Sequence, residues 1–121
     1  MQRLRRTHSV ETEDVMEYIF TVENFEDEVL KSELPVLVDF YADWCNPCKM
    51  MAPAVETLSK ELEGKCKVGK CDVQANMAIA QKYRVASIPN FIVFKNGQPA
   101  ANFIGAMSAD ELRSQVNQAL A

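Results

Sequence analysis

The sequence predicts a single α/β domain in which a central mixed β-sheet is flanked by helices on both faces. Apolar, strand-like runs alternate with amphipathic helical segments along most of the chain, which favours parallel strands at the centre of the sheet. Near the carboxy terminus, Asn96-Gly97 separates two strand-like runs and predicts a tight antiparallel hairpin. At 121 residues the chain is long enough for one packed core but not for two.

The first elements are a short strand, a helix and a buried strand. Residues 18–20 form an apolar run, and Thr21 is expected to cap a following helix whose apolar face carries Phe25, Val29 and Leu30. Residues 36–41 are almost continuously apolar and predict a central strand buried on both faces.

A long helix is expected from Cys45 to about Leu62, ending at Gly64. Its apolar face should carry Met50, Met51, Val55, Leu58 and Leu62. Pro53 lies inside this segment and should kink the helix, because proline has no backbone N–H to donate.

The second half of the chain repeats the alternation and then closes the sheet. Residues 67–73 predict a strand, 77–83 a short helix, and 91–95 and 99–104 the two strands of the hairpin. Ser108-Ala-Asp-Glu111 is a capping box that opens a terminal helix with an apolar face at Leu112, Val116 and Leu120.

Composition narrows the classes of function. We expect residues 1–15 to be a flexible extension and residues 16–121 to form the domain, because the opening segment mixes basic and acidic residues without apolar periodicity. It lacks the apolar stretch of a secretory signal, so a cytoplasmic location is expected. A net charge of −4 argues against general binding to nucleic acid or anionic membranes, and no apolar run is long enough for a membrane span. We expect a monomer.

The motif that carries chemistry is Cys45-Asn46-Pro47-Cys48, placed where a buried strand turns into a helix. A thiolate at a helix amino terminus is stabilised by the helix dipole and by free backbone N–H groups, which lower its pKa. Pro47 is tolerated there because the first helical turn does not need its missing donor. Cys45 is expected to be the exposed, attacking thiol and Cys48 the deeper, resolving one. This pattern predicts a thiol–disulfide oxidoreductase.

Zinc binding is the alternative interpretation, because Cys-x-x-Cys is also a common zinc-ligand spacing. Its other ligands would have to be Cys66 and Cys71, since the only histidine is His8. Five residues along a strand separate these two cysteines by roughly 16 Å and place them on opposite faces. We therefore expect no metal site, and we expect Cys66 and Cys71 to be buried as small apolar residues.

Residues 38–50 read VDFYADWCNPCKM and strongly resemble the active-site segment of the thioredoxin family. The resemblance runs in order through about residues 18–121, with further matches at Pro53, Lys70, 85–89, 94–97 and 103–106. It implies a thioredoxin fold and the reduction of disulfide-containing protein substrates. It also implies that no cofactor is bound and that electrons come from NADPH through a separate thioredoxin reductase.

Other site residues follow from position. Asp39 interrupts an apolar strand, so burial should raise its pKa. The resemblance implies that Asp39 accepts the proton of Cys48, that Lys70 pairs with this acid, and that Pro89 is a cis-proline facing the disulfide. It also implies an apolar collar for substrate around Cys45, formed by Trp44, Ile88, Pro89, Gly105 and Ala106.

Two residues beside the site depart from the family pattern. Asn46 stands where thioredoxins usually have glycine, and Asn90 follows Pro89 where threonine is usual. Because of these departures, the sequence does not determine the redox potential. An oxidase or isomerase with a higher potential is therefore an alternative. A domain of the same fold that only binds partners is a further alternative, against which the retained cysteines and Asp39 argue.

Overall fold

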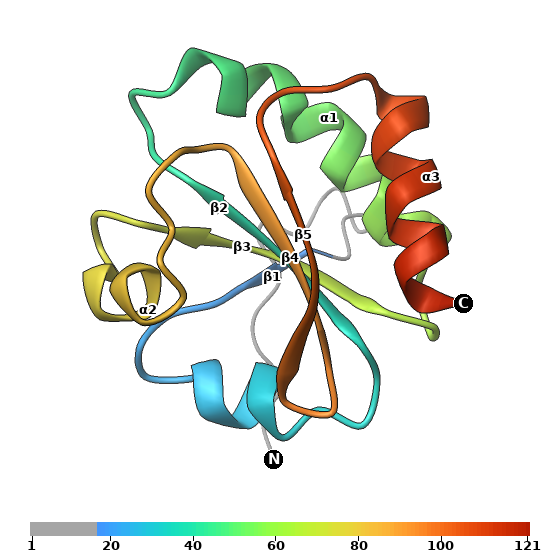
Figure 1. Cartoon of the computed structure of the whole chain (residues 1–121), viewed down its shortest axis with the longest axis horizontal. Coiled ribbons are helices and arrows are strands. Elements are labelled where there is room, and N and C mark those ends of the chain that lie inside the picture. The colour runs from blue at the N-terminus through green and yellow to red at the C-terminus, as the bar shows by residue number, and fades with distance from the viewer. Residues whose placement is uncertain (1–16) are drawn as a thin grey trace, which may run out of the picture.

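A five-stranded mixed sheet forms the centre of the computed structural model, which describes residues 17–121 (Figure 1). The order across the sheet is β1-β3-β2-β4-β5. β1 and β2 both run parallel to β3, while β4 is antiparallel to β2 and β5 is antiparallel to β4. The strands are β1 (Tyr18–Ile19), β2 (Val36–Tyr41), β3 (Lys67–Asp72), β4 (Asn90–Lys95) and β5 (Gln98–Ile104). The predicted combination of parallel core strands and an antiparallel hairpin is confirmed.

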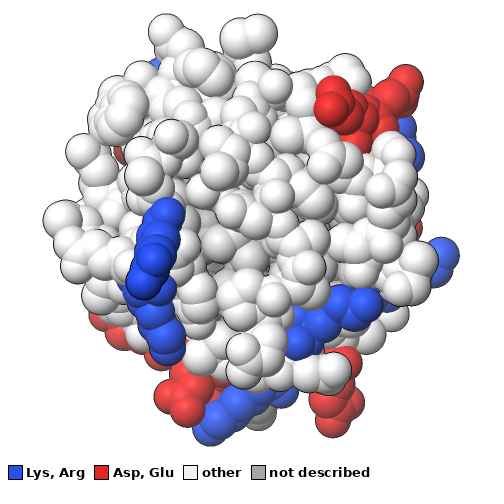
Figure 2. Space-filling model, viewed as in Figure 1, with Lys and Arg blue, Asp and Glu red and all other residues white. Residues whose placement is uncertain are grey.

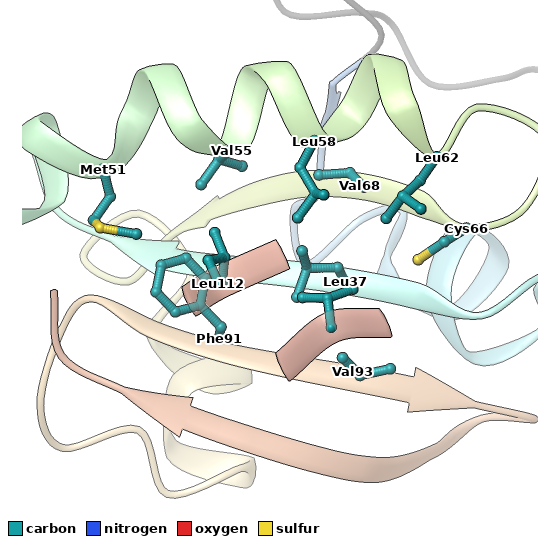
Figure 3. Close-up of a cluster of buried hydrophobic side chains, with 11 residues drawn as sticks. Leu37, Met51, Val55, Leu58, Leu62, Cys66, Val68, Phe91, Val93 and Leu112 are labelled. Carbon is teal, nitrogen blue, oxygen red and sulfur yellow. The ribbon is translucent and has the colours of Figure 1, made fainter. Parts of the chain in front are cut away.

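Helices cover both faces of the sheet, as predicted. In Figure 1, α1 (Asn46–Glu61) and α3 (Ala109–Leu120) lie at the upper right, and η2 (Glu26–Leu30) and α2 (Met77–Lys82) lie at the lower left. The core is correspondingly divided in two. One cluster joins α1 and α3 to the sheet through side chains that include Leu37, Val55, Leu58, Phe91 and Leu112 (Figure 3). The other joins η2 and α2 to the opposite face through Phe25, Val29, Val38, Ile79 and Phe94.

Turns and caps show the local chemistry that the sequence indicates. Asn96 and Gly97 have φ angles of 54° and 79°, so both adopt the positive φ values that a two-residue hairpin of type I′ requires. The Ser108 side chain accepts a hydrogen bond of 3.0 Å from the Glu111 N–H and caps α3. Within residues 17–121, no helix is both long enough and apolar enough to cross a membrane.

One local expectation is met in a different form and one is wrong. The Thr21 carbonyl accepts a hydrogen bond of 2.9 Å from the Phe25 N–H at the start of the helical segment, and the Asn24 side chain accepts one of 2.9 Å from the Thr21 N–H. The segment that follows contains the short π-helix η2, which buries Val29. Met50 is 76% exposed, because the buried face of α1 is set by Met51, Val55 and Leu58 and Met50 lies about 100° away from it.

Candidate active site

The Cys-Asn-Pro-Cys motif lies at the carboxyl end of β2, where the chain turns through four residues into α1. The Cys45 N–H donates a hydrogen bond of 3.1 Å to the Ala42 carbonyl and closes this turn. Phe40 pairs with Asn90 and Asn90 pairs with Ile104, so the segments before β4 and after β5 lie at the same end of the sheet. Figure 1 shows these two segments gathered near the start of α1.

Cys45 and Cys48 form a disulfide, and their Cα atoms are 5.2 Å apart. Cys45 is the N-cap of α1, and its sulfur accepts a hydrogen bond of 3.2 Å from the Cys48 N–H. Pro47 occupies the first helical turn, where its missing N–H costs no helical hydrogen bond. In the reduced protein the same position would place a Cys45 thiolate against the positive end of the helix dipole.

The expected difference in exposure between the two cysteines is wrong for the disulfide form. Cys45 is 4% exposed and Cys48 is 5% exposed, and both pack with Ala42 in one small apolar cluster. Ile88, Tyr41 and Val73 cover this cluster. The two sulfurs are therefore distinguished by their positions at the helix start and not by solvent access.

Asp39 is buried in β2, as predicted. Leu37 belongs to the core cluster under α1, and Asp39, two residues further along the strand, points to the same face. Its side chain is 5% exposed, and its Oδ1 has no hydrogen-bond partner among the described residues. Burial raises the pKa of Asp39 to about 7, with a further upward contribution from Glu17 and a downward one from Lys70.

A cavity of about 150 Å³ connects Asp39 with the motif. Both Asp39 and Cys48 line it, together with Tyr41, Ala42, Asp43, Lys49, Ala52 and Lys70. A cavity of this size, lined in part by charged side chains, has room for water molecules, each of which needs only about 10–15 Å³ of such space. A proton could therefore pass between the Cys48 sulfur and the Asp39 carboxylate without direct contact.

Lys70 lies beside Asp39 in the register between β2 and β3, so their side chains share a face of the sheet. Among the described residues no ion pair joins them; the Lys70 Nζ lies 5.0 Å from the centroid of the Tyr41 ring. The positive charge of Lys70 nevertheless lowers the pKa of Asp39. Lys70 thus affects Asp39 through its charge and not through a direct ion pair.

The structure brings together some of the residues that were expected to form the apolar collar. The Ile88–Pro89 peptide bond is cis, and the Pro89 carbonyl accepts a hydrogen bond of 2.8 Å from the Gly105 N–H. Ile88 packs against the two cysteines, whereas Trp44 is 63% exposed and Ala106 is exposed. Apart from an acidic cluster at the upper right, the upper and central parts of the face in Figure 2 carry few charged side chains.

Two features of the site were missed by sequence reasoning. Asn90 is 2% exposed, and Asn102 donates hydrogen bonds to its Oδ1 and, at 3.0 Å, to the Phe91 carbonyl. Glu17 is 5% exposed, and burial raises its pKa to about 7. Both depend on which strands pair and in which register: Asn90 on the β4–β5 hairpin, and Glu17 on the pairing of β1 with β3.

The remaining cysteines lie apart from the motif. Cys66 and Cys71 are free and buried, and they belong to core clusters on opposite faces of the sheet, as predicted. Burial raises the pKa of each thiol to about 12. Within residues 17–121, no group of three or more His, Cys, Asp or Glu side chains is placed to hold a metal ion.

Comparison with known proteins agrees with this geometry. The family model described as Thioredoxin matches residues 17–118. Thioredoxin from Rickettsia bellii is 46% identical over 97 residues, which are 80% of this chain and 92% of that protein. Thioredoxin from Rickettsia felis is 44% identical over 100 residues, covering 83% of this chain and 95% of that protein. Thioredoxin Y, chloroplastic, from Oryza sativa is 44% identical over 100 residues, covering 83% of this chain and 60% of that protein.

Proposed function

The chain belongs to the thioredoxin family and is a thiol–disulfide oxidoreductase that reduces protein disulfides, and we propose that Cys45 attacks and Cys48 resolves. The observation that carries this assignment is the hydrogen bond from the Cys48 N–H to the Cys45 sulfur. An N-cap sulfur receives the backbone donors and the dipole of the helix, so Cys45 is the thiol most readily ionised. The lower pKa makes Cys45 the nucleophile at neutral pH.

The reaction is two successive thiol–disulfide exchanges. The Cys45 thiolate attacks one sulfur of a substrate disulfide, forming a mixed disulfide and releasing the other sulfur as a thiolate. Cys48 then loses its proton and attacks the Cys45 sulfur, which breaks the mixed disulfide. The substrate leaves with both sulfurs reduced, and Cys45 and Cys48 are left as the disulfide that the structure holds.

Asp39 is proposed as the general base for Cys48. It lines the same cavity, and a carboxyl group with a pKa of about 7 can both accept and release a proton near neutral pH. Lys70 is proposed to limit how far burial raises that pKa. Both roles require the cavity to carry the proton between the carboxylate and the thiol.

The residues around the disulfide are proposed to bind substrate. Trp44 and Ala106 are exposed beside the motif, while Ile88, Pro89 and Gly105 are held together behind them. An extended peptide carrying the disulfide would contact this apolar rim, and the fixed Pro89 loop would set its position. The few charged side chains on the upper and central parts of the face in Figure 2 support substrates that dock by apolar contact.

The electron source is proposed from the family relationship. Oxidised protein would be returned to the dithiol by NADPH through a separate thioredoxin reductase, and no cofactor would be bound to this chain. A cytoplasmic location and a monomeric state are part of the same proposal. The family relationship is the one to the Rickettsia thioredoxins, whose length this chain nearly spans.

The order of attack is tested by trapping. Cys48→Ser should accumulate a stable mixed disulfide with a protein substrate, because no thiol remains to resolve it, whereas Cys45→Ser should give neither the adduct nor turnover. Non-reducing gels and insulin reduction would measure both. Cys71→Ser, which changes a buried cysteine outside the site, is the control and should behave as the unmodified protein. Adducts formed by Cys45→Ser but not by Cys48→Ser would reverse the assignment.

A further inference from the structure

We propose that Glu17 is a positioning residue for the proton transfer at Asp39: the two carboxyl groups share the Lys70 ammonium, and Glu17 thereby sets the pH at which Asp39 exchanges its proton. This inference rests on the base role proposed above for Asp39. It concerns a residue outside the motif and outside the cavity.

The register of three neighbouring strands places these groups on one face of the sheet. Lys70 in β3 pairs with Asp39 in β2 on one side and with Ile19 in β1 on the other. Glu17 lies two residues before Ile19 and therefore points to the same face. The acid, the lysine and the second acid thus follow one another across β1, β3 and β2, beneath α1.

Both acids are covered, and Lys70 is the cation whose charge acts on each of them. Glu17 and Asp39 are each 5% exposed. The positive charge of Lys70 lowers the pKa of both acids, and the negative charge of Glu17 raises that of Asp39. When two buried carboxyl groups share one cation, ionising both of them leaves one negative charge without a compensating positive charge.

Other ionisable groups on this face do not replace Lys70. Glu56 on α1 faces Glu17 and raises its pKa. Asp43, Lys49 and Tyr41 line the cavity near Asp39. The Asp72 carboxylate, at the end of β3, accepts hydrogen bonds of 2.8 and 3.2 Å from the backbone N–H groups of Gln74 and Ala75.

Removing the charge of Glu17 should therefore make Asp39 more acidic. Lys70 would then have one buried acid to stabilise, and the repulsion from Glu17 would be gone. We expect the titration midpoint of Asp39 in Glu17→Gln to fall by about one pH unit. At pH 6 the ionised fraction of Asp39 would then rise roughly fivefold, from about a tenth to about a half.

The experiment uses the full chain and two readouts. Carboxyl NMR gives the titration midpoint of Asp39, and stopped-flow measurement of mixed-disulfide resolution gives the pH profile of the proposed step. Glu28→Gln is the matched control: Glu28 is 6% exposed, but it pairs with Lys67 at 3.0 Å and belongs to η2, which covers the opposite face. This control should leave both readouts unchanged.

The outcomes separate this inference from the proposed base role. An Asp39 midpoint that stays in place in Glu17→Gln overturns the inference while leaving the base role intact. A pH profile that survives Asp39→Asn overturns the base role, and with it the positioning role. If Glu17→Gln does not fold, the unmodified protein still decides, because coupled acids must show each other's titration step in their carboxyl shifts and uncoupled acids must not.

Discussion

Asp39 occupies a position that favours function over stability. Its neighbours in β2, Val38 and Phe40, are fully buried, and an apolar side chain would fit the strand pattern better. A buried carboxyl group without a full set of partners costs free energy, and the cost is lowest when the group is protonated. The base role proposed for Asp39, which lines a cavity with Cys48, would account for this cost, since a carboxylate with an ordinary pKa is a weak acceptor for a thiol proton.

Asp39→Asn should stabilise the fold at alkaline pH and much less at acidic pH. The pKa of Asp39 is about 7 in the folded protein and near 3.8 when the chain is unfolded, so between these values the folded state holds the proton more tightly. The free energy of unfolding must then decrease as pH rises from about 4 to about 7, and level off above. Asparagine does not ionise, so Asp39→Asn lacks this contribution to the pH dependence of the free energy of unfolding.

Urea denaturation of both proteins at pH 5 and pH 8 would measure this effect. We expect the stability advantage of Asp39→Asn to grow by roughly 2–3 kcal/mol between these pH values, at about 1.4 kcal/mol per pH unit up to the folded pKa. An advantage that is the same at both pH values would show that Asp39 titrates normally.

Residues whose role depends on local sequence could be predicted, and those that depend on register could not. Cys45, Cys48 and Asp39 stand out because a helix start or an apolar strand surrounds them within a few positions. Glu17 comes to lie on the same face of the sheet as Lys70 only because β1 pairs with β3, more than 50 residues away in the chain. Asn102 meets Asn90 through the pairing of β4 with β5, which fixes partners only once the hairpin register is known.

At the scale of elements, β1 is the shortest strand, and Glu17 directly precedes it. It contains two residues, and Tyr18 lies opposite Gly69 in its pairing with β3. A Cβ atom added to Gly69 would lie 2.5 Å from the Phe20 ring and 2.7 Å from the Tyr18 carbonyl oxygen. The absence of a side chain at Gly69 is therefore what allows the first strand to join the sheet.

Gly69→Ala should lower the free energy of unfolding by about 1–3 kcal/mol, because Phe20 is fully buried and cannot move away without loss of packing. Gly64→Ala is a useful comparison: nothing lies within 4 Å of the added Cβ, and only the positive φ of 85° opposes it. Chemical denaturation of both variants would separate crowding from backbone strain. A smaller loss for Gly69→Ala than for Gly64→Ala would contradict the crowding argument.

Element boundaries were predicted closely wherever hydrophobic periodicity and turn residues agreed. β2 and α3 illustrate this, since a continuous apolar run and a capping box define them. The helix after β1 was expected to be an ordinary helix, whereas η2 is a π-helix of five residues. The Asn24 side chain accepts a hydrogen bond from the Thr21 N–H and donates one to the Ile19 carbonyl, which ties the start of this segment to the end of β1.

Across the whole molecule, the redox site is built from segments that meet only in the folded chain. The motif follows β2, the cis-proline loop precedes β4, and the Gly105 loop follows β5. Antiparallel pairing of β2 with β4 and of β4 with β5 brings these three segments to one end of the sheet. Closure of the hairpin is thus a condition for assembling the proposed substrate-binding rim as well as for the core.

Residues 1–15 lie outside the described residues, and the sequence predicts that they form a flexible extension. Their deletion should change neither the melting temperature, within about 2 °C, nor the rate of insulin reduction, because the segment has no apolar face to bury. Deletion of residues 1–17 is the informative comparison, since it also removes Glu17. That longer deletion should move the Asp39 midpoint downward as Glu17→Gln does, whereas the shorter one should not. A fall of several degrees on removing residues 1–15 would instead show that the extension packs against the domain.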